Sequence, residues 1–220
     1  MSFTAASTEE VTLRYVLPST RAARMTTSVT GFHTTVDHDL IFDPTEATTV
    51  AVGPTDRLGA LAWARVQPRP WMDLNAWVAY TSSTVESAAL DGRLAAGSAI
   101  PYLPALVARL DAAVDGQVAT VARLPLRMHA GLGASLRGAA GMIATPPTPV
   151  VALLDANVGA RLGFVGLDLS AKNLLDTRWH AADFEYPSNF NPAAMRDATP
   201  VRHFVAGSPL LVFATVSLSL

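Results

Sequence analysis

The sequence predicts an all-β fold, an antiparallel transmembrane β-barrel meander that contains about nine strands of a larger barrel. Three observations indicate this fold. Apolar and polar residues alternate with a period of two, the connections between alternating segments are alternately short and long, and the chain ends on Leu220 without a polar tail. Short turns at one rim and long loops at the other are typical of outer-membrane barrels.

The composition leaves two places for the apolar residues. The chain has 220 residues, of which 50% are hydrophobic and only 15% are charged. It contains no run of about 18 uncharged apolar residues, so transmembrane helices are excluded. The apolar side chains therefore lie either in a dense soluble core or on one face of alternating strands.

Charge and cysteine content exclude several classes of function. The net charge is −2, and Lys and Arg are scattered rather than clustered, so no nucleic-acid partner is predicted. The absence of cysteine excludes disulfides, thiolate metal sites and cysteine nucleophiles. Residues 1–7 contain neither the basic segment nor the apolar run of a signal peptide. An outer-membrane location therefore requires a further segment upstream, and we expect the chain to be part of a longer protein.

The last segment shows the alternation most clearly. Its apolar face consists of Val212, Ala214, Val216, Leu218 and Leu220. The opposite face consists of Phe213, Thr215, Ser217 and Ser219. A period of two with apolar residues on one side indicates a strand rather than a helix.

The same pattern predicts the other strands in order. The expected strands are 11–17, 25–42, 57–67, 72–83, 106–114, 126–137, 152–162, 165–172 and 212–220. Short turns are expected near 18–24, 68–70, 115–117 and 162–164, and long loops near 43–56, 87–103, 138–149 and 177–203. The segment 115–125 is ambiguous. An odd number of antiparallel strands does not close, because its edge strands run parallel, so the chain is either a partial barrel or contains one further strand near 115–125.

The polar faces carry charges in the middle of strands. We interpret the following residues as lining a polar lumen: Asp73, Asp111, Arg127, His129, Asp155 and Asp168. The opposite faces consist of Leu, Ala and Val almost throughout, as expected for a surface that meets lipid. The alternative is a soluble β-sandwich or calyx that binds an apolar ligand, since its strands also alternate.

One motif near the C-terminus resembles a known family. Residues 167–179, Leu-Asp-Leu-Ser-Ala-Lys-Asn-Leu-Leu-Asp-Thr-Arg-Trp, resemble the penultimate strand of TonB-dependent receptors from Gram-negative outer membranes. Residues 200–204 and 207–209 are similar to the approach to the last strand of that family. Weaker similarity to receptor-barrel segments is found at 39–42, 57–59, 70–74 and 100–104.

The resemblance implies a barrel of about 22 strands with an N-terminal plug, which takes up siderophores, cobalamin, haem or sugars. Residues 1–220 would be the C-terminal part of such a barrel, without the plug. The implied partners are outer-membrane lipid, the barrel-assembly machinery through the C-terminal strand, a small-molecule ligand, and TonB only through missing N-terminal parts. No enzymatic activity and no cofactor are implied. A further alternative is a truncated, non-functional receptor remnant.

The long loop after residue 177 concentrates the candidate ligand-binding residues, which are Trp179, His180, Asp183, Phe184, Glu185 and Tyr186. Aromatic and carboxylate side chains on an external loop could contact an iron chelate, whereas the aromatic rings could equally form a girdle at the membrane rim. Asn173 and Asp176 are interpreted as residues whose side chains satisfy backbone groups at a bend.

No metal or catalytic site is predicted. The five histidines lack metal-ligand spacing. The glycines of segment 131–138 match neither a serine-nucleophile turn nor a dinucleotide-binding loop, because no strand-turn-helix unit surrounds them. We interpret them as strand positions where the side chain must be small.

Overall fold

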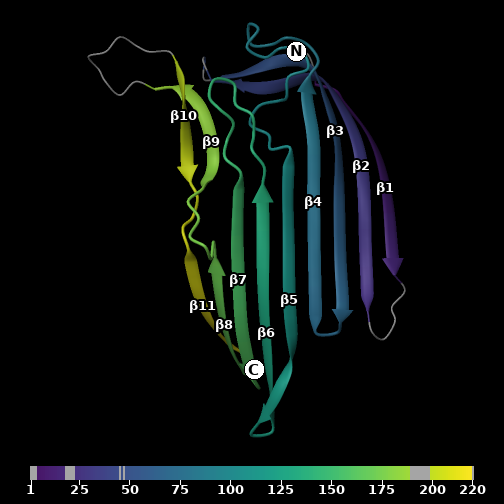
Figure 1. The fold of residues 1–220 in the computed structure, drawn as a ribbon, viewed down its shortest axis with the longest axis vertical. Helices are drawn as coiled ribbons and strands as arrows, with labels where there is room; N and C mark the ends of the chain where they lie inside the picture. The colour runs from purple at the N-terminus through teal and green to yellow at the C-terminus, as the bar shows by residue number, and fades with distance from the viewer. Residues whose placement is uncertain (1–3, 18–22, 45, 47, 189–198, 220) are drawn as a thin grey trace, which may run out of the picture.

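The computed structural model describes residues 4–17, 23–44, 46, 48–188 and 199–219, which form eleven strands (Figure 1). No helix among them is long and apolar enough to cross a membrane. The strands are β1 (Ala6–Leu17), β2 (Arg24–Asp43), β3 (Thr48–Arg69), β4 (Met72–Val85), β5 (Leu106–Val121), β6 (Leu124–Arg137), β7 (Val151–Leu162), β8 (Val165–Lys172), β9 (His180–Pro187), β10 (Pro200–Ala206) and β11 (Leu211–Leu218).

Nine of the strands form one antiparallel sheet. Its order is β1-β2-β3-β4-β5-β6-β7-β8-β11, and β9 and β10 form a separate hairpin between β8 and β11 in the chain. β1 and β11 lie at opposite edges, so the sheet is not closed (Figure 1). The predicted all-β meander with about nine barrel-type strands is confirmed.

The register places like residues on one face across many strands. Residues directly opposite each other in neighbouring strands point to the same side of a sheet. One such row contains Leu74, Ala112, Leu132, Ala156, Ala171 and Val212. A row on the other side contains Asn75, Asp111, Gly133 and Asp155. We call these sides the apolar face and the polar face, and their division follows the predicted alternation.

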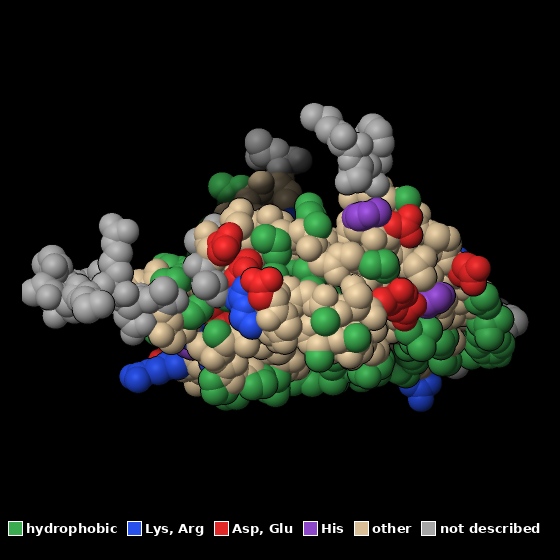
Figure 2. Space-filling model, turned by 90° about the horizontal axis from the view of Figure 1, so that it is seen from above, with side chains coloured by type: hydrophobic (Ala, Val, Ile, Leu, Met, Phe, Trp, Pro, Cys, Tyr) green, Lys and Arg blue, Asp and Glu red, His purple; other side chains and the backbone are tan. Residues whose placement is uncertain are grey.

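The apolar face is not covered by a second layer. Leu132 is 56% exposed and Val212 is 65% exposed. Figure 2 shows hydrophobic side chains in a nearly continuous band along one side of the molecule. Among the described residues, the only other sheet is the hairpin β9–β10, so the nine-stranded sheet is not half of a sandwich.

The buried core lies at the rim with the long connections. It consists of Ile41, Val52, Val85, Leu94 and Ile100. These residues come from the adjoining ends of β2, β3 and β4 and from the loop 86–105. This core packs the loop 86–105 onto the ends of the strands at that rim. It does not cover either face of the nine-stranded sheet along the rest of the strands.

Two predicted connections were wrong. The turn expected near 115–117 does not exist, because β5 continues to Val121 and turns at Ala122 and Arg123. The ladder continues there with a bulge between Gln117 and Ala119, so the turn signal of Asp115-Gly116 is overridden by pairing with β6. The loop expected at 43–56 is largely strand, since β3 begins at Thr48 and pairs with β2.

The remaining connections follow the prediction in part. The long loops expected at 87–103 and 138–149 contain no strand, and they lie at the rim opposite the short β3–β4, β5–β6 and β7–β8 turns (Figure 1). The loop expected at 177–203 contains β9 and β10, which the sequence pattern did not predict. The expected turn at 18–24 falls mainly on residues 18–22 and the end of the last strand on Leu220, both outside the described residues.

Candidate functional site

The first candidate site is the polar face, and one of its clusters is organised around Asp73 of β4, next to the short β3–β4 turn. Its carboxylate accepts hydrogen bonds from Arg65 Nη2 at 2.5 Å, from Gln67 at 2.8 Å and from Asn75 at 2.7 Å. Arg65 and Gln67 lie on β3, and their side chains point to the same side as Asp73. Four polar side chains therefore satisfy one another on the sheet surface rather than leaving a charge unpaired.

Arg109 of β5 connects two of the predicted lumen residues. Its Nη2 lies 2.6 Å from Asp111 Oδ1, and its Nη1 lies 3.7 Å from Asp155 Oδ2. Gly133 lies between Asp111 and Asp155 in the register, and an added Cβ would approach the Arg109 guanidinium to 2.6 Å. The glycine therefore leaves room for an ion-pair network that crosses three strands.

A third cluster lies toward the rim with the short turns. His129 Nε2 lies 3.0 Å from Asp168 Oδ1, and Arg127 pairs with Asp115. These residues line a hollow of about 370 Å³ together with Arg161. The six predicted lumen residues thus all have polar partners on the polar face, four of them in ion pairs with arginine or aspartate and His129 and Asp168 in contact with each other. Arg65, Arg109 and Asp115 are their partners, which the sequence interpretation did not single out because pairing depends on side-chain geometry and register.

The described residues contain no group of three or more His, Asp or Glu side chains placed to hold a metal ion. The clusters on the polar face pair charged and hydrogen-bonding groups with one another.

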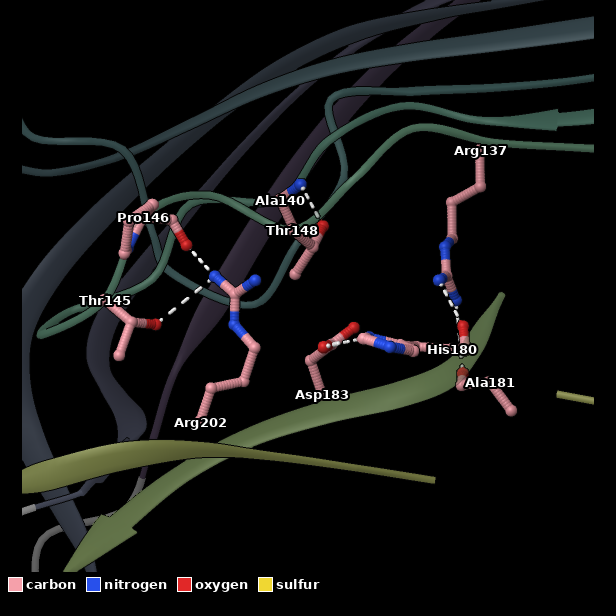
Figure 3. Close-up of polar contacts among 9 residues, drawn as sticks. All are labelled: Arg137, Ala140, Thr145, Pro146, Thr148, His180, Ala181, Asp183 and Arg202. Carbon is pink, nitrogen blue, oxygen red and sulfur yellow. Dashed lines mark hydrogen bonds and ion pairs between the residues drawn. The ribbon is translucent and has the colours of Figure 1, made fainter. Parts of the chain in front are cut away.

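The second candidate site is the hairpin β9–β10. His180 Nδ1 lies 2.8 Å from Asp183 Oδ1, and the His180 ring stacks on Phe204 with ring centroids 3.9 Å apart. Arg137 at the end of β6 donates to the carbonyl oxygens of His180 at 2.6 Å and Ala181 at 3.1 Å (Figure 3). The start of the hairpin is thereby attached to the nine-stranded sheet.

Glu185 attaches the same hairpin to the loop 138–150. Its side chain is fully buried and accepts backbone hydrogen bonds from Ile143 at 2.8 Å, Ala144 at 3.1 Å and Thr145 at 2.5 Å. The Tyr102 hydroxyl donates to the same carboxylate at 3.2 Å. Burial opposes ionisation of Glu185, but the hydrogen bonds from Thr145 and the backbone outweigh it, so its pKa lies below the ordinary value.

The opposite face of the hairpin carries aromatic side chains. The Tyr186 and His203 rings stack with centroids 3.7 Å apart. Phe184 is 41% exposed and Tyr186 is 38% exposed. Because side chains alternate along a strand, Phe184 and Tyr186 point away from the side on which Glu185 contacts the loop 138–150.

Trp179 and Asn173 hold the connections around the hairpin. Trp179 Nε1 donates to the Ser208 carbonyl at 3.1 Å, and its ring lies so close to Gly207 that an added Cβ would approach it to 2.2 Å. The Asn173 amide donates to the carbonyls of Thr177 at 2.9 Å and Ser208 at 3.0 Å, and its Oδ1 accepts from Thr177 N at 2.9 Å. Asp176 accepts from Leu210 N at 2.9 Å. The predicted backbone role of Asn173 and Asp176 is confirmed.

The structure thus separates the six predicted ligand residues into two groups. His180, Asp183, Glu185 and Trp179 are engaged in contacts within the protein, whereas Phe184 and Tyr186 present exposed rings. Arg137, Tyr102 and Arg202 take part in the same site and were not predicted. Arg137 and Tyr102 lie more than 40 positions from the hairpin residues that they contact, and Arg202 lies more than 50 positions from the loop residue that it contacts. No local sequence pattern therefore indicates these three residues.

The fold has close counterparts among solved structures. The sequence itself matches no family model and no curated protein. The ferric-catecholate import receptor Fiu from E. coli K12 superposes with a TM-score of 0.65 at 19% identity over 97% of the chain. From Acinetobacter baumannii, the ferric preacinetobactin receptor BauA and the siderophore receptor PiuA also reach 0.65, at 17% and 19% identity over 96% of the chain.

The chain spans only part of these receptors. It corresponds to 27% of the length of Fiu, 29% of BauA and 28% of PiuA. At such identities the likeness concerns the fold of the backbone alone. The chain therefore has the fold of a segment of the barrel found in TonB-dependent siderophore receptors.

Proposed function

We propose that residues 1–220 are the C-terminal part of an outer-membrane receptor barrel for TonB-dependent uptake of a siderophore or similar scarce nutrient. The location would be the outer membrane of a Gram-negative bacterium. One observation carries the proposal. A single-layer sheet of nine antiparallel strands leaves its whole apolar face uncovered, and its backbone superposes on siderophore receptors over nearly the full chain.

The uncovered apolar face supports lipid as its partner. Leu and Val side chains are exposed on every strand of this face, far more than a soluble monomer presents in one patch. In hydrocarbon the same side chains are well solvated, and the backbone groups of the strands between β1 and β11 are satisfied by neighbouring strands. The proposal further includes the barrel-assembly machinery as a partner of β11, and TonB as a partner of segments outside this chain.

The residues at the rim with the long connections support the proposed contact with a ligand. There the aromatic rings of Phe184 and Tyr186 are exposed on a hairpin that His180, Asp183 and Glu185 hold in place. A rigid support with exposed rings is a common way to build a binding surface. The polar face below it would line the path of a polar solute, with paired polar side chains at Asp73, Asp111, Arg127, His129, Asp155 and Asp168.

The test has two parts. The chain is fused to an export signal and produced in a Gram-negative host, and the membranes are separated by density. We expect the protein in the outer-membrane fraction, resistant to extraction by urea. Recovery as a soluble monomer without detergent would refute the barrel proposal.

The second part measures ligand binding with the detergent-solubilised chain. Tryptophan fluorescence is titrated with ferric siderophores of catecholate and mixed-ligand types. We expect saturable quenching that the double substitution Phe184→Ala and Tyr186→Ala weakens at least about tenfold, since aromatic anchors dominate binding energies. Trp71→Ala at the opposite rim is the matched control. Membrane insertion without any binding would favour the non-functional remnant.

A further inference from the structure

The loop 138–150 carries a concave group of backbone donors and has contacts of its own outside the hairpin. Its neck is closed by Ala140 and Thr148, which exchange hydrogen bonds of 2.8 and 2.9 Å (Figure 3). Both residues are buried. Gly141 O accepts from Tyr102 N at 2.8 Å, which ties the loop to its neighbour 86–105. The three consecutive amides of residues 143–145 are therefore held in a fixed loop.

Successive amides that converge on one point form an anion-binding concavity. In this loop the amides of Ile143, Ala144 and Thr145 all donate to the Glu185 carboxylate, at distances between 2.5 and 3.2 Å. The Tyr102 hydroxyl supplies a further donor at 3.2 Å. No salt bridge to Glu185 is found among the described residues, so its charge is stabilised by hydrogen bonds from the backbone amides, from the Thr145 side chain and from the Tyr102 hydroxyl.

A second observation indicates that the site has donor capacity beyond its present use. Arg202 is the register partner of Glu185 on β10, and its Nη2 contacts Thr145 Oγ1 at 3.3 Å and the Pro146 carbonyl (Figure 3). Its Nε is buried and has no hydrogen-bond partner within the part of the chain that the structure describes. A guanidinium beside three amides raises the affinity for an anion.

We propose that the amides of residues 143–145, with Arg202 beside them, form an anion site for small carboxylates, and that Glu185 is its resident ligand. We call this site the anion nest. Protection of the three amides then depends on occupancy of the anion nest by a carboxylate, supplied by Glu185 or by a free carboxylate in its place. The inference does not rest on the proposed transport function, because it concerns only contacts within this chain.

The test measures hydrogen exchange at the amides of residues 143–145 by mass spectrometry on the full chain in detergent micelles. Glu185→Ala removes the resident carboxylate, and we expect exchange there to become at least about tenfold faster. Sodium formate should restore most of the protection, whereas sodium chloride at the same ionic strength should not. Glu86→Ala, which removes an exposed carboxylate in the neighbouring loop, is the control and should leave exchange unchanged.

Each alternative outcome counts against the anion nest. Equal exchange in Glu185→Ala and the parent chain would show that the contact does not protect these amides. If Glu185→Ala loses protection and formate restores it no better than chloride, Glu185 is a structural anchor and the loop does not bind free carboxylates. Glu185→Gln keeps the side-chain volume without the charge, so exchange at the parent rate in that variant would refute anion binding even if Glu185→Ala failed to fold.

Discussion

Leu132→Arg is the substitution that tests the facing of the sheet most directly. Leu132 lies near the middle of β6 on the apolar face, where it is 56% exposed and flanked in register by Ala112 and Ala156. Neither alanine offers a group that could pair with an introduced guanidinium. If this face meets lipid, the new charge lies in hydrocarbon without a partner.

The expected magnitude follows from this environment. Arg near the bilayer midplane on the lipid face of a barrel costs about 2–4 kcal/mol. That range corresponds to a shift of about thirtyfold to a thousandfold in the ratio of assembled to unassembled protein. Ser135→Arg places the same side chain on the polar face of the same strand, opposite Arg109, whose charge Asp111 and Asp155 already balance. There we expect a cost below about 1 kcal/mol.

The assay is a urea titration of the chain in lipid vesicles, followed by tryptophan emission, for the parent chain and both variants. Leu132→Ala separates the loss of the leucine from the gain of the charge. We expect Leu132→Arg to be far more destabilising than Leu132→Ala, and Ser135→Arg to resemble the parent. Equal effects of the two arginines, or a larger effect at position 135, would refute the assignment of the faces.

Three further predictions follow from individual contacts. Deletion of residues 216–220 removes the last three residue pairs between β11 and β8, so we expect no outer-membrane assembly; normal levels in the membrane fraction would contradict this. Gly59→Ala places a Cβ 2.4 Å from the Phe32 ring and 2.6 Å from the Tyr80 carbonyl, and should destabilise by about 1–3 kcal/mol in urea titration, whereas Gly31→Ala, with nothing within 4 Å, should be neutral. The pKa of Glu185 is lowered from 4.5, so the stabilisation that its carboxylate gives to hairpin docking is fully present above pH 4.5 and is lost as the pH falls through the folded-state pKa. Hydrogen exchange at the amides of residues 143–145, corrected for intrinsic rates, should therefore become faster as the pH is lowered through that range. Faster corrected exchange on raising the pH would contradict this sign.

The strand pattern was predictable because it is local. Alternation along β6 assigns Leu132 and Ser135 to opposite faces without reference to any other strand. The backbone role of Asn173 was predictable for the same reason, since its main partner, Thr177, is four residues away. Where a local signal competed with a distant partner, it failed, as at Asp115-Gly116, where pairing with β6 carries the strand on to Val121.

The candidate site was predictable in composition but not in arrangement. The segment 179–186 stands out by its aromatic and acidic residues, yet nothing local distinguishes Glu185, which is buried, from Tyr186, which is exposed. The difference arises because Glu185 faces the amides of residues 143–145, some forty positions away in the chain. A buried carboxylate is stable only where hydrogen-bond donors or a cation compensate for the loss of its hydration.

The sequence by itself determined the all-β class, the division of the strands of the nine-stranded sheet into an apolar and a polar face, and the sharp turns between β3 and β4 and between β7 and β8. These properties follow from the period of a single strand and from turn chemistry within a few residues. Only the tertiary structure decided which charges pair across the polar face, that 180–206 forms a hairpin, and that Glu185 fills the anion nest. Those features depend on register between strands and on loops distant in sequence, and a contact between distant segments leaves no periodic mark on either one.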